Sequence, residues 1–363
     1  KQAYSVLMSV YQKENPEYLR AAVESVLGQT VPPEEVVLVC DGPLTEALDG
    51  VIAEYEEQFP ENSEEIMNLR ESGLQGNGLS ENDQQGDTCQ KGKIQGKNPQ
   101  ESQRQENSNQ KVIFRVVRLP ENGGLGKALN EGLKYCSCEW IARMDTDDLS
   151  APDRCEKQLK FLEEHPEVDV VSGTIAEFQG DALDGKTAET AVISYKTVPE
   201  TQKEIAAYIK QRNPLNHPCV MFRKASVELS GGYQPCPYFE DYDLWVRMYR
   251  DHAQFANLPD TLLYMRVDGM HQRRGGLRYA KCVIDFRVKM YRNQVITFGE
   301  FLPMTVVRVL VSLMPNSLRR FLYEKKLRKQ QCYVSLKRKI KTMRCKPNYS
   351  RSPKVYTGLV PFP

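Results

Sequence analysis

The stretch Trp140-Ile141-Ala142-Arg143-Met144-Asp145-Thr146-Asp147-Asp148-Leu149 joins an apolar, strand-like segment directly to a cluster of carboxylates. These acids repel one another, so at a strand end they need a cation or a set of hydrogen-bond donors. Mg²⁺ and Mn²⁺ prefer oxygen ligands and usually share their sites with substrate phosphates. The stretch therefore indicates metal-assisted handling of a nucleoside diphosphate. The alternative is a loop in which Asp147 or Asp148 caps a helix that opens near Pro152.

Strand-like and helical segments alternate on the N-terminal side of this stretch. We expect strands at residues 4–10, 35–40, 112–118 and 139–144, and helices at 16–27, 44–59 and 125–135. This alternation predicts an α/β fold whose largely parallel sheet is covered by helices on both faces. Ligands bind beyond the carboxyl ends of the strands in such sheets, and both Asp41 and Asp145 stand at such ends.

The composition limits the classes of protein that fit. The chain has 363 residues and a net charge of +1, which suits one large or two smaller globular domains and argues against nucleic-acid binding. The ten cysteines show no paired CxxC spacing, which favours a reduced, cytosolic compartment. No basic-then-apolar leader is visible, and the apolar run 301–314 is too short to span a membrane.

The second half has a less regular pattern. After Asp148 we expect a helix at 152–164, a strand at 168–172, an irregular stretch to about 199, a helix at 203–210 and another opening at 238–248. Residues 62–110 are rich in Gln, Asn, Gly, Ser and Glu, and predict a disordered polar insertion. A passive loop is one interpretation of this insertion, and a regulatory element is the other.

Two further motifs could carry chemistry. Glu240-Asp241, with Asp243, opens a helix; these acids either favour the helix dipole or supply a general base that deprotonates a sugar hydroxyl. The segment Glu121-Asn122-Gly123-Gly124-Leu125-Gly126-Lys127-Ala128 is a glycine-rich turn that enters a helix. Such a turn can bind phosphate through its backbone amides, but ordinary turn chemistry also accounts for it.

The order of these motifs resembles that of the family 2 glycosyltransferases with the GT-A (Rossmann-like) fold, over roughly residues 1–270 apart from the insertion. The matching segments are 5–11, 39–42, 122–130, the DxD motif at 145–148 and the ED motif at 240–244. The resemblance divides the chain into a nucleotide-binding half (1–61), the insertion (62–110), the rest of the catalytic domain (111–274), a helical, basic extension (275–346) and a flexible tail (347–363).

The resemblance also implies roles for individual residues. Asp145 would contact the ribose or the metal, and Asp147 would coordinate Mn²⁺ or Mg²⁺. Asp41 would contact the nucleotide base. Asp241 would be the catalytic base of an inverting enzyme that turns an α-linked UDP-sugar into a β-glycoside. The remaining nucleotide and acceptor positions implied are Ser9, Tyr11 and Lys127 on the nucleotide side and Glu240 on the acceptor side.

Histidines and arginines of the second half complete the candidate set. The family often supplies a metal or phosphate ligand from a histidine after the last strand; here Asp268 stands near that place and His271 follows, so the assignment is open. Arg273 and Arg274 either clamp the diphosphate or belong to a basic surface loop. His217 is either a hydrogen-bonded structural histidine or an acceptor contact.

The C-terminal region suggests a membrane partner. Apolar residues 301–314 precede many Lys and Arg residues up to Lys346, which suits peripheral docking on the anionic inner face of the cell membrane; a helix packed on the catalytic domain with a solvated basic face is the alternative. Segments 18–20, 39–43 and 273–276 look like those of capsule, amylovoran and O-antigen galactosyl- or glucosyltransferases, whose acceptors are polyprenyl-diphosphate-linked sugars.

Two other classes share some of these features. A sugar nucleotidyltransferase would need a glycine-rich, arginine-bearing loop after the first strand, and residues 11–14 (Tyr-Gln-Lys-Glu) do not provide one. A non-enzymatic sugar-nucleotide-binding scaffold would be expected to have lost an acid of the DxD or ED motif, and both motifs are intact.

Overall fold

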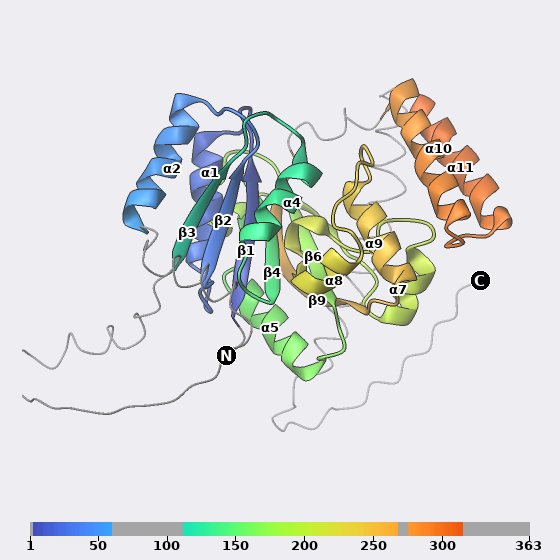
Figure 1. Ribbon diagram of the computed structural model, residues 1–363, viewed down its shortest axis with the longest axis horizontal. Helices are drawn as coiled ribbons and strands as arrows, with labels where there is room; N and C mark the ends of the chain where they lie inside the picture. The colour runs from blue at the N-terminus through green and yellow to red at the C-terminus, as the bar shows by residue number, and fades with distance from the viewer. Residues whose placement is uncertain (1–2, 60–111, 268–274, 315–363) are drawn as a thin grey trace, which may run out of the picture. The chain divides into compact units, whose positions relative to one another are not determined.

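The computed structural model describes residues 3–59, 112–267 and 275–314, which form one sheet with helices packed against it (Figure 1). The strand order is β3-β2-β1-β4-β8-β6-β9-β5, and β7 pairs with β6 beside this path. The described residues up to Met314 belong to one compact unit.

The first half of the sheet is parallel throughout. It contains β3 (Ile113–Arg118), β2 (Glu35–Cys40), β1 (Tyr4–Val10) and β4 (Trp140–Asp145). In this register Ser9 pairs with Val39 on one side and Asp145 on the other, so the carboxyl ends of the strands meet at one edge. The candidate residues that follow these strands therefore gather there.

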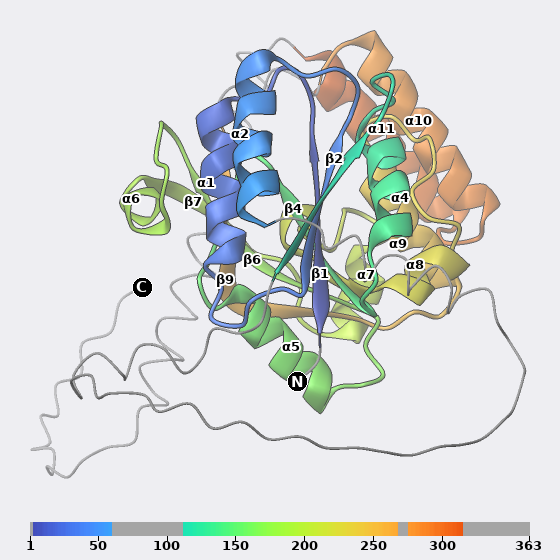
Figure 2. The ribbon, with the colours of Figure 1, turned by 60° about the vertical axis from the view of Figure 1, so that its left-hand side comes forward.

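Helices α1 (Pro16–Leu27), α2 (Glu46–Gln58) and α4 (Leu125–Tyr135) connect these strands. Strand side chains alternate between two cores: Val6 and Met8 join the core beneath α1 and α2, whereas Leu7 joins the core beneath α4. Figure 2 shows α1 and α2 on one side of β1 and β2 and α4 on the other. Burial of both faces explains why β1 and β2 are apolar along most of their length.

The second half of the sheet is mixed. Strand β8 (Met221–Arg223) pairs antiparallel with β4 and with β6 (Val170–Phe178). Strand β9 (Phe255–Arg266) runs parallel to β6, while β5 (Leu149–Ser150) and β7 (Val192–Lys196) pair antiparallel with β9 and β6. This arrangement brings the end of β9 beside the acidic turn that leaves β4.

The remaining helices are α5 (Arg154–Glu164), α6 (Gly185–Thr190), α7 (Gln202–Tyr208), α8 (Lys224–Leu229), α9 (Glu240–Arg250), α10 (Leu277–Arg292) and α11 (Phe298–Leu313). Helix α9 carries the ED motif, and its core-facing side, centred on Trp245, shares a cluster with Phe286 of α10. Helices α10 and α11 lie side by side in both views (Figures 1 and 2).

The sequence predicted the alternating elements of the first half to within two residues, and the structure confirms an α/β, largely parallel sheet flanked by helices. Two expectations are wrong. The stretch from 173 to 199 is not irregular, because β6 continues to Phe178 and pairs with β7. Neither Asp147 nor Asp148 caps a helix, since α5 begins at Arg154 after Asp153.

The domain boundaries proposed from the sequence stay predictions. The insertion 62–110, the basic segment from 315 to 346 and the tail 347–363 lie outside the described residues. Among the described helices, none is both long and apolar enough to cross a bilayer.

Candidate active site

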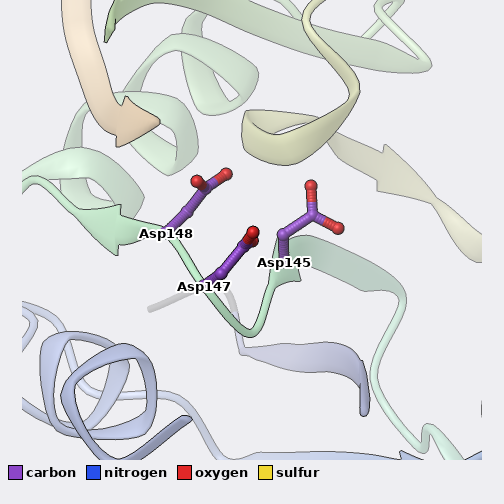
Figure 3. A group of neighbouring side chains, drawn as sticks. All are labelled: Asp145, Asp147 and Asp148. Carbon is purple, nitrogen blue, oxygen red and sulfur yellow. The ribbon is translucent and has the colours of Figure 1, made fainter. Parts of the chain in front are cut away.

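An acidic turn connects β4 to β5 at the carboxyl edge of the sheet. One oxygen from each of Asp145, Asp147 and Asp148 lies within 4.8 Å of the others, and the side chains point to the same side of the turn (Figure 3). Burial, followed by the charges of Asp145 and Glu14, raises the pKa of Asp147. The turn thus concentrates negative charge where water screens it poorly.

Asp148 is the most buried acid of this turn, with 1% of its surface exposed. Its Oδ1 accepts a hydrogen bond from the backbone N–H of Arg266 at 2.9 Å, whereas its Oδ2 has no hydrogen-bond partner among the described residues. Burial and the charge of Asp147 raise the pKa of Asp148 well above its ordinary value. Instead of capping α5, Asp148 fastens the turn to the end of β9.

Arg266 holds this junction together from the other side. Its guanidinium donates to the carbonyl oxygen of Asp147 at 3.2 Å and to that of Ala182 at 2.7 Å. It also lies 3.7 Å from the ring centre of Tyr18, in a cation–π contact. One arginine thereby connects the acidic turn, the loop after β6 and helix α1.

Glu14 is a fourth acid at the site, and the sequence analysis did not identify it. Its Oε2 accepts from Thr146 Oγ1 at 3.1 Å, and the same hydroxyl lies 3.2 Å from the carbonyl oxygen of Ser9. Burial raises the pKa of Glu14, and the charge of Asp145 adds to the rise. No motif marks Glu14, because it reaches the acidic turn only when β1 and β4 pair.

Arg143 lies directly beneath the turn, two residues before Asp145 on the same side of β4. Its guanidinium forms an ion pair with Asp145 and is 1% exposed. Within the described part of the chain, its Nε and Nη1 have no hydrogen-bond partner. The ion pair fixes the direction of the Asp145 carboxylate and offsets part of the negative charge of the turn.

Asp41, at the end of β2, binds the glycine-rich turn. Its carboxylate accepts from the backbone N–H groups of Gly123 at 2.7 Å and Gly124 at 3.0 Å. The neighbouring Gly42 has φ +84°, and a side chain there would lie 2.6 Å from the backbone nitrogen of Asn122. Both oxygens of Asp41 are therefore already hydrogen-bonded, and this acid shapes the turn that precedes α4.

Asp241, in the first turn of α9, is half-buried and held by a neighbour. Asn213 Nδ2 donates to Asp241 Oδ2 at 2.6 Å. Burial raises the pKa of the nearby Tyr233 hydroxyl, and the charge of Arg143 opposes the rise. The charges of Asp241 and Asp145 both raise this pKa further, so both carboxylates act on the same buried hydroxyl.

His217 belongs to the interior of this region. Its Nε2 is 2.9 Å from Tyr233 Oη, and its ring is edge-on to Trp245 at 6.1 Å. Burial, with the nearby charges of Arg143 and Lys196, lowers the pKa of His217 well below its ordinary value. The surroundings are those of a neutral, hydrogen-bonded histidine, the first of the two interpretations made from the sequence.

The other predicted positions lie around this edge. Ser9 and Tyr11 are partly exposed at the end of β1, and Glu240 is partly buried beside Asp241. Lys127 is half-exposed and lies 3.4 Å from Glu121, on the outer side of the glycine-rich turn. The predicted residues His271, Arg273 and Arg274, together with Asp268, lie outside the described residues.

The donor set of the acidic turn fits a hard divalent cation. It offers carboxylate oxygens from Asp145 and Asp147, with the unpartnered Oδ2 of buried Asp148 nearby. Hard cations favour such oxygens, and a double positive charge would balance the four acids of the site, to which Arg143 and Arg266 contribute only two positive charges.

Comparisons with known proteins agree with this fold. The model of the glycosyl transferase family 2 matches residues 5–77 and 100–229, more than half of the chain. The chain therefore belongs to glycosyl transferase family 2.

Three relatives cover most of the chain. An uncharacterized glycosyltransferase of Haemophilus influenzae is 36% identical over 90% of this chain and 99% of its own length. The amylovoran biosynthesis glycosyltransferase AmsE of Erwinia amylovora is 33% identical over 89% and 98%. The UDP-Gal:alpha-D-GlcNAc-diphosphoundecaprenol beta-1,3-galactosyltransferase of Escherichia coli is 28% identical over 90% and 97%. Family 2 relatives of this chain thus act in polysaccharide biosynthesis.

Solved structures confirm the GT-A fold. The mannosyltransferase PcManGT of Pyrobaculum calidifontis, in complex with GDP-Man and Mn²⁺, has a TM-score of 0.52 and 13% identity over 95% of this chain and 88% of its own. S. aureus TarS 1–349, in complex with UDP-GlcNAc, has a TM-score of 0.51 and 16% identity over 90% and 76%. At these identities the likeness concerns the fold alone.

Proposed function

We propose that this glycosyltransferase is an inverting, metal-dependent hexosyltransferase. It moves a hexose from a UDP-sugar to a lipid-linked sugar or oligosaccharide during cell-surface polysaccharide synthesis. One observation carries the proposal: the acidic turn of Asp145 to Asp148 gathers three carboxylates at the carboxyl edge of the sheet, and the charges of both Asp145 and Asp241 act on the hydroxyl of buried Tyr233. A donor bound at the turn and an acceptor bound at Asp241 would meet near Tyr233.

On the donor side, Asp145 and Asp147 would hold Mn²⁺ or Mg²⁺. The bound ion would neutralise charge on the diphosphate as it leaves. Asp41 and the glycine-rich turn that it binds would form the wall beside the nucleotide, with Ser9 and Tyr11 at the end of β1. The E. coli relative is named for UDP-Gal as its donor, which supports the choice of a UDP-sugar.

On the acceptor side, Asp241 would act as the general base. The acceptor oxygen bonds to the anomeric carbon as the bond from that carbon to the diphosphate oxygen breaks. The acceptor's proton passes to the Asp241 carboxylate, and the configuration inverts. Asn213 would position this base through its 2.6 Å hydrogen bond to Oδ2, while Oδ1 accepts from the backbone N–H of Tyr242 at 2.7 Å. Each carboxylate oxygen has a second lone pair, which could accept the substrate hydroxyl.

The acceptor is proposed from the relatives. The E. coli enzyme's name specifies a sugar joined to diphosphoundecaprenol, and the E. amylovora enzyme acts in amylovoran biosynthesis. A polyprenyl-diphosphate sugar would keep the enzyme at the inner face of the cell membrane. Synthesis of capsule or O-antigen is consistent with this chemistry.

The experiment is a panel of UDP-sugars with Mn²⁺ and a synthetic lipid-diphosphate sugar of short, soluble chain. Acceptor-dependent release of UDP is the expected result, and its loss in EDTA would confirm the metal requirement. Asp241→Asn should lower kcat by about 10²–10⁴-fold, with Asp251→Asn at the other end of α9 as the matched control. Formation of UTP and sugar 1-phosphate from the UDP-sugar when pyrophosphate is added would identify a nucleotidyltransferase, and binding without turnover would identify a scaffold.

A further inference from the structure

Helix α11 carries an apolar face that points away from the catalytic domain. Leu302, Val306, Leu310 and Leu313 follow one another at helical spacing, and between 47% and 56% of each is exposed. More than half of the large apolar side chains exposed in the described residues lie on α10 and α11. Phe298 and Val307 of α11 and Leu277, Ile284 and Tyr291 of α10 complete this set.

The charged residues of α11 point the opposite way. Glu300 and Arg308 are its only charged residues between Phe298 and Leu313. Glu300 pairs with Lys210 at 3.1 Å, and Arg308 donates to the carbonyl oxygen of Gln211 at 2.6 Å. Surface helices normally turn their polar side to solvent, so this helix is inverted relative to the usual arrangement.

The inversion is fixed by buried contacts. Arg287 of α10 is 2% exposed and donates to the carbonyl oxygens of Lys210 at 2.6 Å and Glu300 at 2.7 Å. Thr297 and Glu300 form a capping box at the start of α11. The apolar face is therefore held outward by the polar anchors on its other side.

We infer that the outward face of α11, centred on Leu302, Val306 and Leu310, docks on the surface of an anionic lipid bilayer. An amphipathic helix with an apolar face of this kind lies in the membrane interface. Helix α11 has 16 residues, fewer than the roughly 20 that a spanning helix needs. The helix would therefore lie on the bilayer instead of crossing it.

Charge favours a bilayer over a second copy of the chain. Residues 315–346 follow α11 in the sequence and contain twelve Lys or Arg residues with a single acid, Glu324. Arg278, Lys281 and Arg292 of α10 are also exposed. Anionic headgroups attract such a set of charges, whereas two copies meeting through this face would bring two strongly basic segments together.

Helix α10 packs beside α11 and connects it to the helix of the proposed base. Phe286 of α10 contacts Tyr242 of α9, with ring centres 4.8 Å apart. Lys289 of α10 lies 2.6 Å from Asp243, which is in the same turn of α9 as Asp241. The inference rests on the proposed function in this respect: an enzyme that uses a lipid-linked acceptor needs its acceptor side held at the membrane. The binding to lipid itself does not depend on the chemistry.

The test uses the full chain and two sets of vesicles, phosphatidylcholine alone and phosphatidylcholine with phosphatidylglycerol. A triple variant, Leu302→Gln, Val306→Gln and Leu310→Gln, should lose at least about tenfold in vesicle binding, because each side chain is exposed and gains apolar contact only on docking. The matched control replaces three exposed apolar residues elsewhere, Leu183, Tyr195 and Leu229, and should bind as the parent does.

A second readout locates the contact. Both native tryptophans are buried, so the indole of a Val306→Trp variant would report on α11. Its emission should shift to the blue with anionic vesicles and be quenched by brominated lipid. High salt should weaken binding, since headgroup attraction is electrostatic.

Three results would overturn the inference. The first is equal vesicle binding by the parent and the triple variant. The second is a concentration-dependent dimer, seen by sedimentation equilibrium, that the triple variant abolishes; this result would assign the face to a second copy. The third is a Val306→Trp emission that is already blue-shifted without lipid, which would show that the chain covers its own face.

UDP release with the short, soluble acceptor separates this inference from the proposed function. The triple variant should keep that activity while losing vesicle binding. If the parent binds vesicles and shows no transfer with any donor, the proposed function fails and the docking face stands.

Discussion

The acidic turn after β4 and helix α9 at Asp243 both contain a buried carboxylate, but the charged groups around the two carboxylates differ. Asp243 has Arg247 Nε at 3.0 Å and Lys289 Nζ at 2.6 Å, and its charge is balanced within the protein. In the turn, Arg143 faces Asp145, Asp147 and Asp148 with Glu14 close by. The first arrangement is a finished structural contact, and the second leaves negative charge for a ligand to balance.

The network around Asp243 extends beyond this ion pair. Arg247 also donates to the carbonyl oxygen of Gly232 at 2.6 Å. Asn130 of α4 donates to the carbonyl oxygen of Tyr233 at 2.6 Å and accepts from the backbone N–H of Tyr233 at 2.8 Å. Through these contacts α9, α10, α4 and the loop before α9 hold one another. Such a closed network gives the proposed base Asp241 a rigid support.

The largest expected effect comes from removing the charge of Asp243. Asp243→Asn leaves buried Arg247 and partly exposed Lys289 without a charged partner, and should lower the free energy of unfolding by about 3 kcal/mol, because the Arg247 guanidinium stays buried. Urea denaturation measures the change. Asp251→Asn, an exposed acid just after the same helix, should cost less than about 0.5 kcal/mol. A small loss for Asp243→Asn would mean that water reaches the pair and the two regions do not differ as described.

The next prediction tests directly whether the acidic turn binds a cation. Mn²⁺ at about 100 times its dissociation constant should stabilise the parent by about 2.7 kcal/mol, because only the folded turn assembles the carboxylates. Asp147→Asn should abolish this gain. Asp285→Asn, an exposed acid of α10, should keep it. Thermal unfolding with and without Mn²⁺ is the measurement, and equal gains in all three proteins would place the ion elsewhere.

The residues of the acidic turn were easier to predict from the sequence than the contacts around Asp243, for a physical reason. Parallel strands buried on both faces leave an apolar pattern, and acids directly after them must gather at one edge; Asp41, Asp145 and Asp147 were therefore found. Glu14 and Arg143 carry no such mark, because each reaches the turn only through strand pairing and the direction of its side chain.

The second half of the fold was harder to predict because its signals are interrupted. Gly173 ended the predicted strand at Ser172, yet β6 continues through it. A side chain at this glycine would lie 2.6 Å from Leu262 Cδ1, so the gap in the pattern is where β9 packs closely. Asn213, which holds Asp241, lies 28 residues away in sequence and belongs to no motif.

A third prediction concerns buried His217 and the pH dependence of stability. The folded-state pKa of His217 is lowered, so the unfolded chain takes up a proton that the folded chain does not below about pH 6.5. The contribution of His217 to stability is therefore largest above this pH and falls as the pH is lowered, by at most about 1.4 kcal/mol per pH unit for one proton. His217→Gln should flatten the decline between about pH 6.5 and 5, whereas exposed His165→Gln should leave it unchanged. An unaltered slope in His217→Gln would show that water reaches this ring.

The smallest expected effect comes from making the same substitution, Asp to Asn, in the acidic turn and comparing it with that at Asp243. In metal-free buffer at pH 8, Asp147→Asn should raise the free energy of unfolding by about 1 kcal/mol, because it removes one charge from a group of buried acids that repel one another. The same chemical change at Asp243 destabilises the protein, so one substitution has opposite signs at the two positions. Urea denaturation in EDTA measures both. If Asp147→Asn lost stability without metal, the acids of the turn would already be balanced by the protein, and their assignment as a cation site would lose its physical basis.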